Sequence, residues 1–142
     1  MPKSFQKKHI SSEAAQQMLA AARKKAHEMG VPMSIAVCDS DGTLKAFERM
    51  DGAALLSVRV AQQKAWTAIS FGMPTHKWFD FIKDDPPLLH GIVHQENLVV
   101  FGGGYPIKDG DDLIGGIGVS GGHYTHDQKV AEAGLAGIGA PA

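Results

Sequence analysis

The side chains best suited to chemistry gather in residues 121–127, near the carboxyl end of the chain. This segment holds two imidazoles and one phenol, from His123, Tyr124 and His126, followed by the carboxyl group of Asp127. Histidine exchanges protons near neutral pH, and both histidine and tyrosine can act as general acids or bases. The segment therefore predicts a catalytic group made of His123, Tyr124 and His126.

The same segment carries the signals of a helix start. Thr125 and Gln128 have the spacing of a capping box, which predicts a helix that begins at His126. Free N–H groups at a helix start attract anions, so we expect an anionic ligand beside Asp127. The alternative is that Asp127 only complements the helix dipole and that the histidines are solvated.

A glycine-rich stretch precedes these residues. Residues 116–121 match the pattern G-x-G-x-x-G, but the glycines fall inside a predicted strand, and the predicted helix starts five residues after Gly121. A dinucleotide fingerprint needs the glycines between strand and helix, so that function is excluded. Gly116 and Gly118 share one strand face. Either a helix rich in small residues, such as residues 61–68, packs there, or a planar ligand does, and strand glycines favour packing.

Two histidines and the single cysteine are further candidates for chemistry. His90 and His94 are four residues apart with Glu96 nearby, the spacing of a metal pair on a helix, although Gly91 weakens that helix and surface histidines are the alternative. Cys38 is the only cysteine, so the chain forms no internal disulfide. It lies in an apolar run, which predicts a buried and unreactive thiol.

Length and composition exclude several classes of protein. A chain of 142 residues predicts a single domain, residues 1–142, and a net charge of −1 supplies no field for nucleic acid or a membrane surface. The sequence has no apolar run long enough to span a bilayer and no signal-peptide core after its basic start. We therefore expect a cytoplasmic protein.

Periodicity and turn signals predict helices and strands in a mixed order. Helices are expected over residues 11–29, 53–71, 75–83 and 125–137, with an irregular or helical segment over 88–94. Strands are expected over residues 33–38, 43–50, 98–101, 105–108 and 113–119. Short connections between strands indicate an antiparallel sheet with helices on its faces, in the α/β (α+β) class.

Several segments together resemble a known family, the GlcG/HbpS-like proteins, which are described as haem-binding or haem-degrading. The matching segments run in order along nearly the whole chain: Ser34-Ile-Ala-Val-Cys-Asp-Ser-Asp-Gly42, Phe47-Glu-Arg-Met-Asp-Gly-Ala53, Ala61-Gln-Gln-Lys-Ala-Trp-Thr-Ala68, Gly103-Gly-Tyr-Pro-Ile107 and Ile114-Gly-Gly-Ile-Gly-Val-Ser-Gly-Gly122, with Asp127. The set of segments is specific, although no single one is.

The resemblance implies a profilin-like α-β-α sandwich on a central five-stranded antiparallel sheet, homo-oligomers, and a role as a haem or corrinoid accessory protein. The acidic E-x-x-E iron motifs of the secreted haem sensor are absent from this sequence. His123 is the best candidate for an axial ligand, with Tyr124 second. The family motifs place ligand-binding residues at Arg49, Asp51, Lys64, Gly104, Pro106, Ser120, Gly121 and Asp127.

Three functions follow as alternatives. The first is a tetrapyrrole-binding protein, in which the glycine face takes the ring, His123 or Tyr124 the metal, and the helix start with Arg49 or Lys64 the propionates. The second is a cofactor-independent catabolic enzyme that uses His123, Tyr124 or His126 on a small carboxylate or lactone. The third is a structural accessory oligomer without a small-molecule site.

Overall fold

The centre of the protein is one antiparallel sheet of four strands, seen in a computed structural model that describes residues 1–142. The strand order is β2-β1-β4-β3, and every neighbouring pair is antiparallel. The strands are β1 (Ser34–Asp39), β2 (Leu44–Arg49), β3 (Gly104–Asp109) and β4 (Asp112–Ser120). The mixed α/β class and the two hairpins agree with the sequence analysis.

The predicted fifth strand over residues 98–101 is wrong. This segment has no strand pairing, because α2 (Leu55–Phe71) holds its backbone instead. The Thr67 hydroxyl donates to the carbonyl of Asn97 at 2.6 Å and accepts from the N–H of Val99 at 3.1 Å. One threonine side chain thus satisfies backbone groups that a neighbouring strand would otherwise pair.

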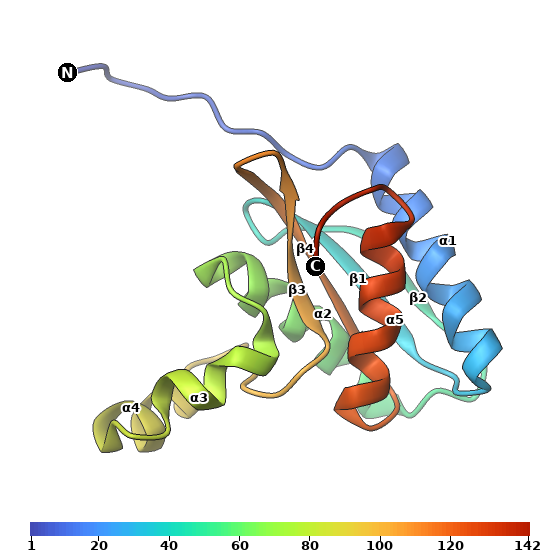
Figure 1. Cartoon of the computed structure of the whole chain (residues 1–142). Helices are drawn as coiled ribbons and strands as arrows, with labels where there is room; N and C mark the ends of the chain where they lie inside the picture. The colour runs from blue at the N-terminus through green and yellow to red at the C-terminus, as the bar shows by residue number, and fades with distance from the viewer.

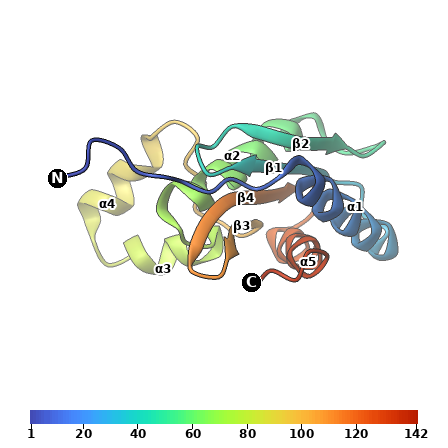
Figure 2. The same cartoon turned by 90° about the horizontal axis from the view of Figure 1, so that it is seen from above.

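Helices cover both faces of the sheet. In Figure 1, α1 (Ser12–Met29, blue) and α5 (Tyr124–Ala136, red) lie side by side in front of the strands, and α2 (green) lies behind them. Figure 2 shows the same layers from above. Ser11 caps α1 by accepting from the N–H of Ala14, and Gly30 ends it with φ 71°. No helix is long and apolar enough to cross a membrane.

Between α2 and β3 the chain leaves the body of the protein. This region contains η1 (Thr75–Lys77), α3 (Trp78–Ile82), α4 (Pro86–Gly91) and η2 (Ile92–His94). Figure 1 shows α3 and α4 extending away from the sheet. No residue of α4 or η2 is buried, whereas Trp78 and Ile82 of α3 are.

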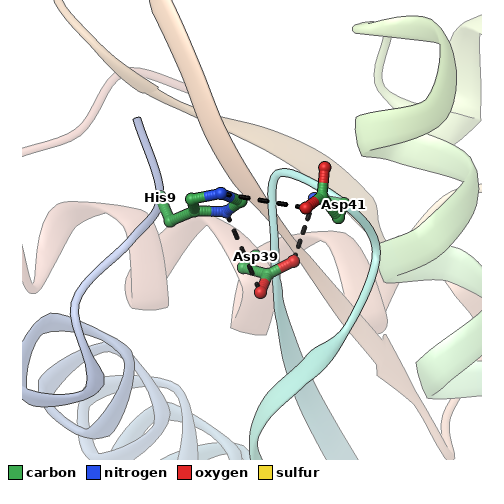
Figure 3. A group of neighbouring side chains, drawn as sticks. All are labelled: His9, Asp39 and Asp41. Atoms are coloured by element: carbon green, nitrogen blue, oxygen red, sulfur yellow. Dashed lines mark hydrogen bonds and ion pairs between the residues drawn. The ribbon is translucent and has the colours of Figure 1, made fainter. Parts of the chain in front are cut away.

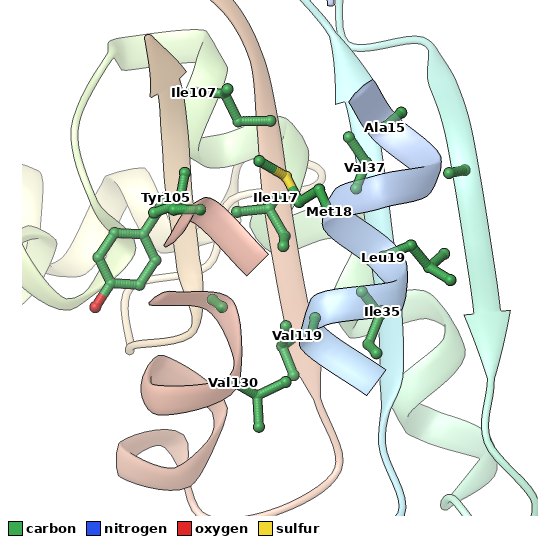
Figure 4. Packing of buried hydrophobic residues seen from close by; sticks show 14 of the residues in the cluster. Ala15, Met18, Leu19, Ile35, Val37, Tyr105, Ile107, Ile117, Val119 and Val130 are labelled. Carbon is green, nitrogen blue, oxygen red and sulfur yellow. The ribbon is translucent and has the colours of Figure 1, made fainter. Parts of the chain in front are cut away.

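The alternation of strand residues divides the core into two layers. In β1, Ile35 and Val37 face α1 and α5, where 18 buried residues form the larger cluster. Figure 4 shows Met18 of α1 and Val130 of α5 packed in this layer with the strand residues. Ala36 and Cys38 face the other way and pack on the small residues of α2.

The glycines of β4 bring α2 close to the sheet. A Cβ atom at Gly118 would fall on the carbonyl oxygen of Ala61, and one at Gly116 would fall on that of Ala65. The face is therefore filled by the backbone of α2. The packing interpretation is confirmed, and the alternative, that this face takes a planar ligand, is wrong.

The single thiol should be unreactive in the folded protein. Cys38 is buried, and its burial raises the pKa of the thiol to about 12, so almost no thiolate forms near neutral pH. We expect iodoacetamide at about pH 8 to label the urea-unfolded chain and to leave the folded protein unlabelled, as measured by mass spectrometry. Equal labelling rates in the two states would contradict the burial of Cys38.

Candidate functional site

Most residues that the sequence marks for function meet at one end of the sheet. Ser34 of β1 pairs with Arg49 of β2 on one side and with Ser120 of β4 on the other. Gly104 pairs with Gly118 two residues before Ser120. The end of β2, the end of β4 and the beginning of β3 therefore lie together, next to the start of α5.

A buried ion pair lies at this end. The Lys64 ammonium on α2 donates to the Asp127 carboxylate on α5 at 2.8 Å and to the carbonyl oxygen of Val119 at 2.9 Å. The two side chains are 0% and 3% exposed. Asp127 also accepts from the N–H of Gly122 at 3.0 Å. The pair connects helices on opposite faces of the sheet beside the end of β4.

Burial is the main influence on the protonation of this pair. It lowers the pKa of Lys64 and raises the pKa of Asp127, because both charged forms lose water. The attraction between the ammonium and the carboxylate opposes both shifts. Each charge therefore depends on the other to remain ionised inside the protein.

Two glycines make room for the ion pair. Gly103 has φ +120°, and a Cβ atom there would lie 2.7 Å from Lys64 Nζ and 2.9 Å from Asp127 Cβ. A Cβ atom at Gly104 would lie 2.5 Å from the carbonyl oxygen of Lys64. The Gly102–Gly104 bend is thus required by the position of Lys64.

The start of α5 differs from the prediction. The helix begins at Tyr124 rather than His126, and its N-cap is His123 rather than Thr125. The imidazole Nδ1 of His123 accepts from the N–H of Thr125 at 3.3 Å, which is the role that a serine or threonine oxygen has in a capping box. Asp127 therefore lies one turn into the helix, where it can reach Lys64.

The structure leaves little of the expected anion site at this helix start, because the protein itself satisfies most of these amides. The N–H groups of His126 and Asp127 donate to the carbonyl of His123, and that of Thr125 donates to its imidazole. The N–H of Gly122 binds the Asp127 carboxylate. A small carboxylate or lactone substrate, as in the catabolic-enzyme alternative, would thus find few free N–H groups at this helix start.

Three exposed rings lie at the start of α5 and beside it, and we call Phe101, His123 and Tyr124 the aromatic patch. The rings of His123 and Tyr124 are tilted by 36° with centroids 4.1 Å apart, and the Phe101 centroid lies 6.5 Å from that of Tyr124. Phe101 is 46% exposed and Tyr124 44%. Lys64 Nζ lies 5.1 Å from the centre of the Phe101 ring. The sequence analysis missed Phe101, although its position directly before three glycines was a usable signal.

His123 can bind a metal in this position. Its Nδ1 lies 2.9 Å from the Thr125 hydroxyl. While Nδ1 accepts in the helix cap, the neutral imidazole carries its proton on Nε2. Metal binding at Nε2 therefore needs the other tautomer, in which Nδ1 donates to this hydroxyl and gives up the N–H of Thr125. His123 is exposed, so this atom needs no rearrangement of the core.

The other predicted residues have more ordinary surroundings. The Arg49 guanidinium donates to the carbonyl of Ala53 through Nε at 3.0 Å and Nη2 at 2.7 Å. Arg49 and the exposed Asp51 line an open groove of about 590 Å³ beside the end of α1. Three predicted positions remain. Pro106 lies in β3 and pairs with Gly116 of β4, Gly121 has φ +145°, and His126 is exposed on α5.

The metal pair suggested for His90 and His94 does not form with Glu96. Those three side chains do not form a group in which the ligand atoms of three residues all lie within 4.8 Å of one another. The one group that does so contains His9, Asp39 and Asp41, and sequence reasoning left His9 without a partner.

Comparison with known proteins agrees with the fold and with the segments noted in the sequence. Residues 10–136 match the family described as "Haem degrading protein HbpS-like". The chain is 36% identical over 130 residues to the corrinoid adenosyltransferase PduO of Citrobacter freundii, covering 91% of this chain and only 39% of that protein.

Two solved structures share the whole fold. The Klebsiella pneumoniae protein ORFY is 35% identical, with a TM-score of 0.90 over 100% of this chain and 99% of the other. A complex of PduOC with haem is 34% identical, with a TM-score of 0.85 over 94% and 97% of the two chains. The chain belongs to the HbpS-like family.

Proposed function

We propose that the protein is a haem-binding accessory protein that holds the ring at the aromatic patch. The observation that carries the proposal is His123, an exposed imidazole beside two exposed aromatic rings, in a family with a solved haem complex. Haem requires an axial donor and an apolar surface for its ring. Haem would supply an iron whose axial position a histidine can take.

The residues present fit these needs. His123 offers Nε2, and the Thr125 hydroxyl at 2.9 Å from Nδ1 orients the imidazole. Phe101 and Tyr124 offer exposed ring faces at 46% and 44% exposure. Aromatic faces stabilise a stacked planar ligand, and a hydrogen bond on the far nitrogen fixes the tautomer that binds a metal.

Two details of the sequence-based hypothesis change. The ring lies on the aromatic patch rather than on the glycines of β4, because α2 fills that face. Lys64 is excluded as a partner for propionates, since its ammonium is fully buried and paired with Asp127. Arg49 remains as the cation for a propionate, because it is exposed at the same end of the sheet.

The aromatic patch is an open surface, so it can cover only one side of a planar ring. We propose that a second copy of the chain covers the other side, which makes the protein a homo-oligomer when haem is bound.

The same site would also accept a corrinoid in this proposal, since the first relative named above is a corrinoid adenosyltransferase. The adenosyltransferase activity itself belongs to a protein of which this chain spans 39%.

A hemin titration tests the proposed site. We expect a shifted Soret band with the wild-type protein and an affinity at least about tenfold lower for His123→Ala, because the axial ligand is lost. Thr125→Val should weaken binding by about tenfold or more, because Nδ1 loses its hydroxyl partner while the backbone N–H of residue 125 is retained. His90→Ala, an exposed histidine on α4, serves as the matched control and should titrate like the wild type.

Two outcomes would contradict the proposal. One is a spectrum of free hemin at every protein concentration, which would exclude haem binding. The other is a His123→Ala variant that titrates like the wild type, which would exclude the aromatic patch as the site. Circular dichroism of each variant shows whether the fold is retained.

A further inference from the structure

A second group of potential metal ligands lies at the opposite end of β1, where this strand ends in the turn to β2. Figure 3 shows the imidazole of His9 facing the carboxylates of Asp39 and Asp41, in the turn between β1 and β2. His9 Nε2 lies 3.8 Å from Asp41 Oδ2, and His9 Nδ1 lies 3.9 Å from Asp39 Oδ2. One ligand atom from each residue lies within 4.8 Å of the other two.

We infer that these three residues bind a divalent first-row transition-metal ion. Each carboxylate has one oxygen fixed by the protein and one left over. Asp39 Oδ1 accepts from the N–H groups of Asp41 and Thr43, and Asp41 Oδ1 binds the Lys7 ammonium at 2.9 Å. Both Oδ2 atoms therefore point to the side of the turn where His9 lies.

The imidazole is held in a matching way. His9 Nδ1 lies 2.8 Å from the hydroxyl of Ser40, a side chain that is itself buried. A proton on Nδ1 directed to this hydroxyl leaves the lone pair of Nε2 for a metal. Ser40 thus has the outer role that orients a ligating histidine in metal sites.

The spacing needs only a small adjustment to close around an ion. Metal–ligand bonds of about 2.1 Å place neighbouring ligand atoms about 3 Å apart. The 3.8 Å between His9 Nε2 and Asp41 Oδ2 exceeds this by less than an ångström, and one ligand atom from each of the three residues lies within 4.8 Å of the others. His9 belongs to an exposed terminal segment, so it can move that far without disturbing the core, and water completes the coordination on the open side.

The ligand types select the metal class. One imidazole and two carboxylates suit Zn²⁺, Co²⁺ or Mn²⁺, whereas Ca²⁺ prefers oxygen alone and Cu⁺ prefers sulfur. The Lys7 ammonium competes with the ion for Asp41, because it lies 2.9 Å from that carboxylate. The Lys7 ammonium therefore lowers the affinity of the site for a metal ion, and removing it should strengthen metal binding.

Metal binding would also fix the start of the chain. The exposed amino-terminal segment already touches the β1–β2 turn through Lys7 and His9, while the following Ile10 is buried and donates its N–H to the carbonyl of Ile114. Figure 1 shows the chain before these contacts extending from the body. An ion on His9, Asp39 and Asp41 would fasten the segment more firmly to the turn. The site would thus control the order of the amino-terminal segment.

Titration with Co²⁺ tests the site, followed by visible absorption and by calorimetry on the full chain. We expect one ion per chain, an affinity at least about tenfold lower for His9→Gln, and a tighter site for Lys7→Gln. His27→Gln replaces an exposed histidine on α1 and should bind Co²⁺ like the wild type. Asp41→Asn should also weaken binding, because it removes one of the two carboxylates.

A second measurement reports on the amino-terminal segment directly. Trypsin cleavage after Lys8 should slow when Zn²⁺ is added to the wild type and should be unaffected by Zn²⁺ in His9→Gln. Equal Co²⁺ affinity of wild type and His9→Gln would overturn the assignment, and so would a Lys7→Gln variant that binds more weakly than the wild type.

Discussion

Replacement of Lys64 by alanine is expected to lower the free energy of unfolding by about 3–5 kcal/mol, measured by urea denaturation. The reason is the carboxylate that stays behind. Asp127 is 3% exposed on its side chain and would keep only the N–H of Gly122 as a partner. An uncompensated charge in the interior costs more than the ion pair contributes.

The double variant Lys64→Met, Asp127→Leu separates the cost of a lone charge from the value of the pair. Both charges are then absent, and we expect much of the lost stability to return, because no unpaired charge is left in the interior. Lys83→Ala breaks an exposed pair with Asp80 and should change the stability by about 0.5 kcal/mol or less. A Lys64→Ala variant as stable as the wild type would contradict a buried charged pair.

The features that sequence predicted well are those that local signals determine. Alternation in β1 and the turn of residues 109–112 predicted two hairpins, and both formed. Ser11 and Gly30 marked the ends of α1 to within a residue. These signals depend on neighbours along the chain, so a single sequence contains them in full.

The features that sequence missed depend on contacts between distant segments. The fifth strand was lost because Thr67, about thirty residues earlier, bonds the backbone of residues 97–99. Lys64 and Asp127 were each marked for function, but their pairing spans 63 residues and has no local signal. His9 lacked a partner in the sequence for the same reason, since the turn that faces it begins thirty residues later.

The histidines illustrate the limits of residue type as a guide to function. Residue type predicted that His123 and Tyr124 lie together at an exposed helix start, and the structure places them there. It could not predict that His123 itself caps the helix, because a histidine cap resembles no common capping pattern. The cap matters for function, because a metal on Nε2 needs the proton on Nδ1 and therefore replaces the hydrogen bond that caps the helix.

The second large effect is expected at Gly118. Gly118→Ala should lower the free energy of unfolding by about 2–4 kcal/mol in the same urea assay. Its new Cβ atom would fall on the carbonyl oxygen of Ala61 and lie 2.5 Å from the amide nitrogen of Ala65. Both atoms belong to the backbone of α2, so a rotation of a side chain cannot relieve the clash.

Gly91→Ala is the matched control, because a Cβ atom at Gly91 meets nothing within 4 Å and the residue has helical φ and ψ. We expect that variant to be as stable as the wild type or more stable by up to about 1 kcal/mol.

The clash at Gly118 would move α2 outward. Lys64 lies on the same helix, and its Cβ atom is 3.0 Å from the position of the new Cβ atom. Gly118→Ala should therefore also weaken the contact between Lys64 and Asp127. The double variant Gly118→Ala, Lys64→Ala should then lose less stability than the sum of the losses in the two single variants. Strict additivity of the two would mean that the distance between α2 and β4 does not control the ion pair.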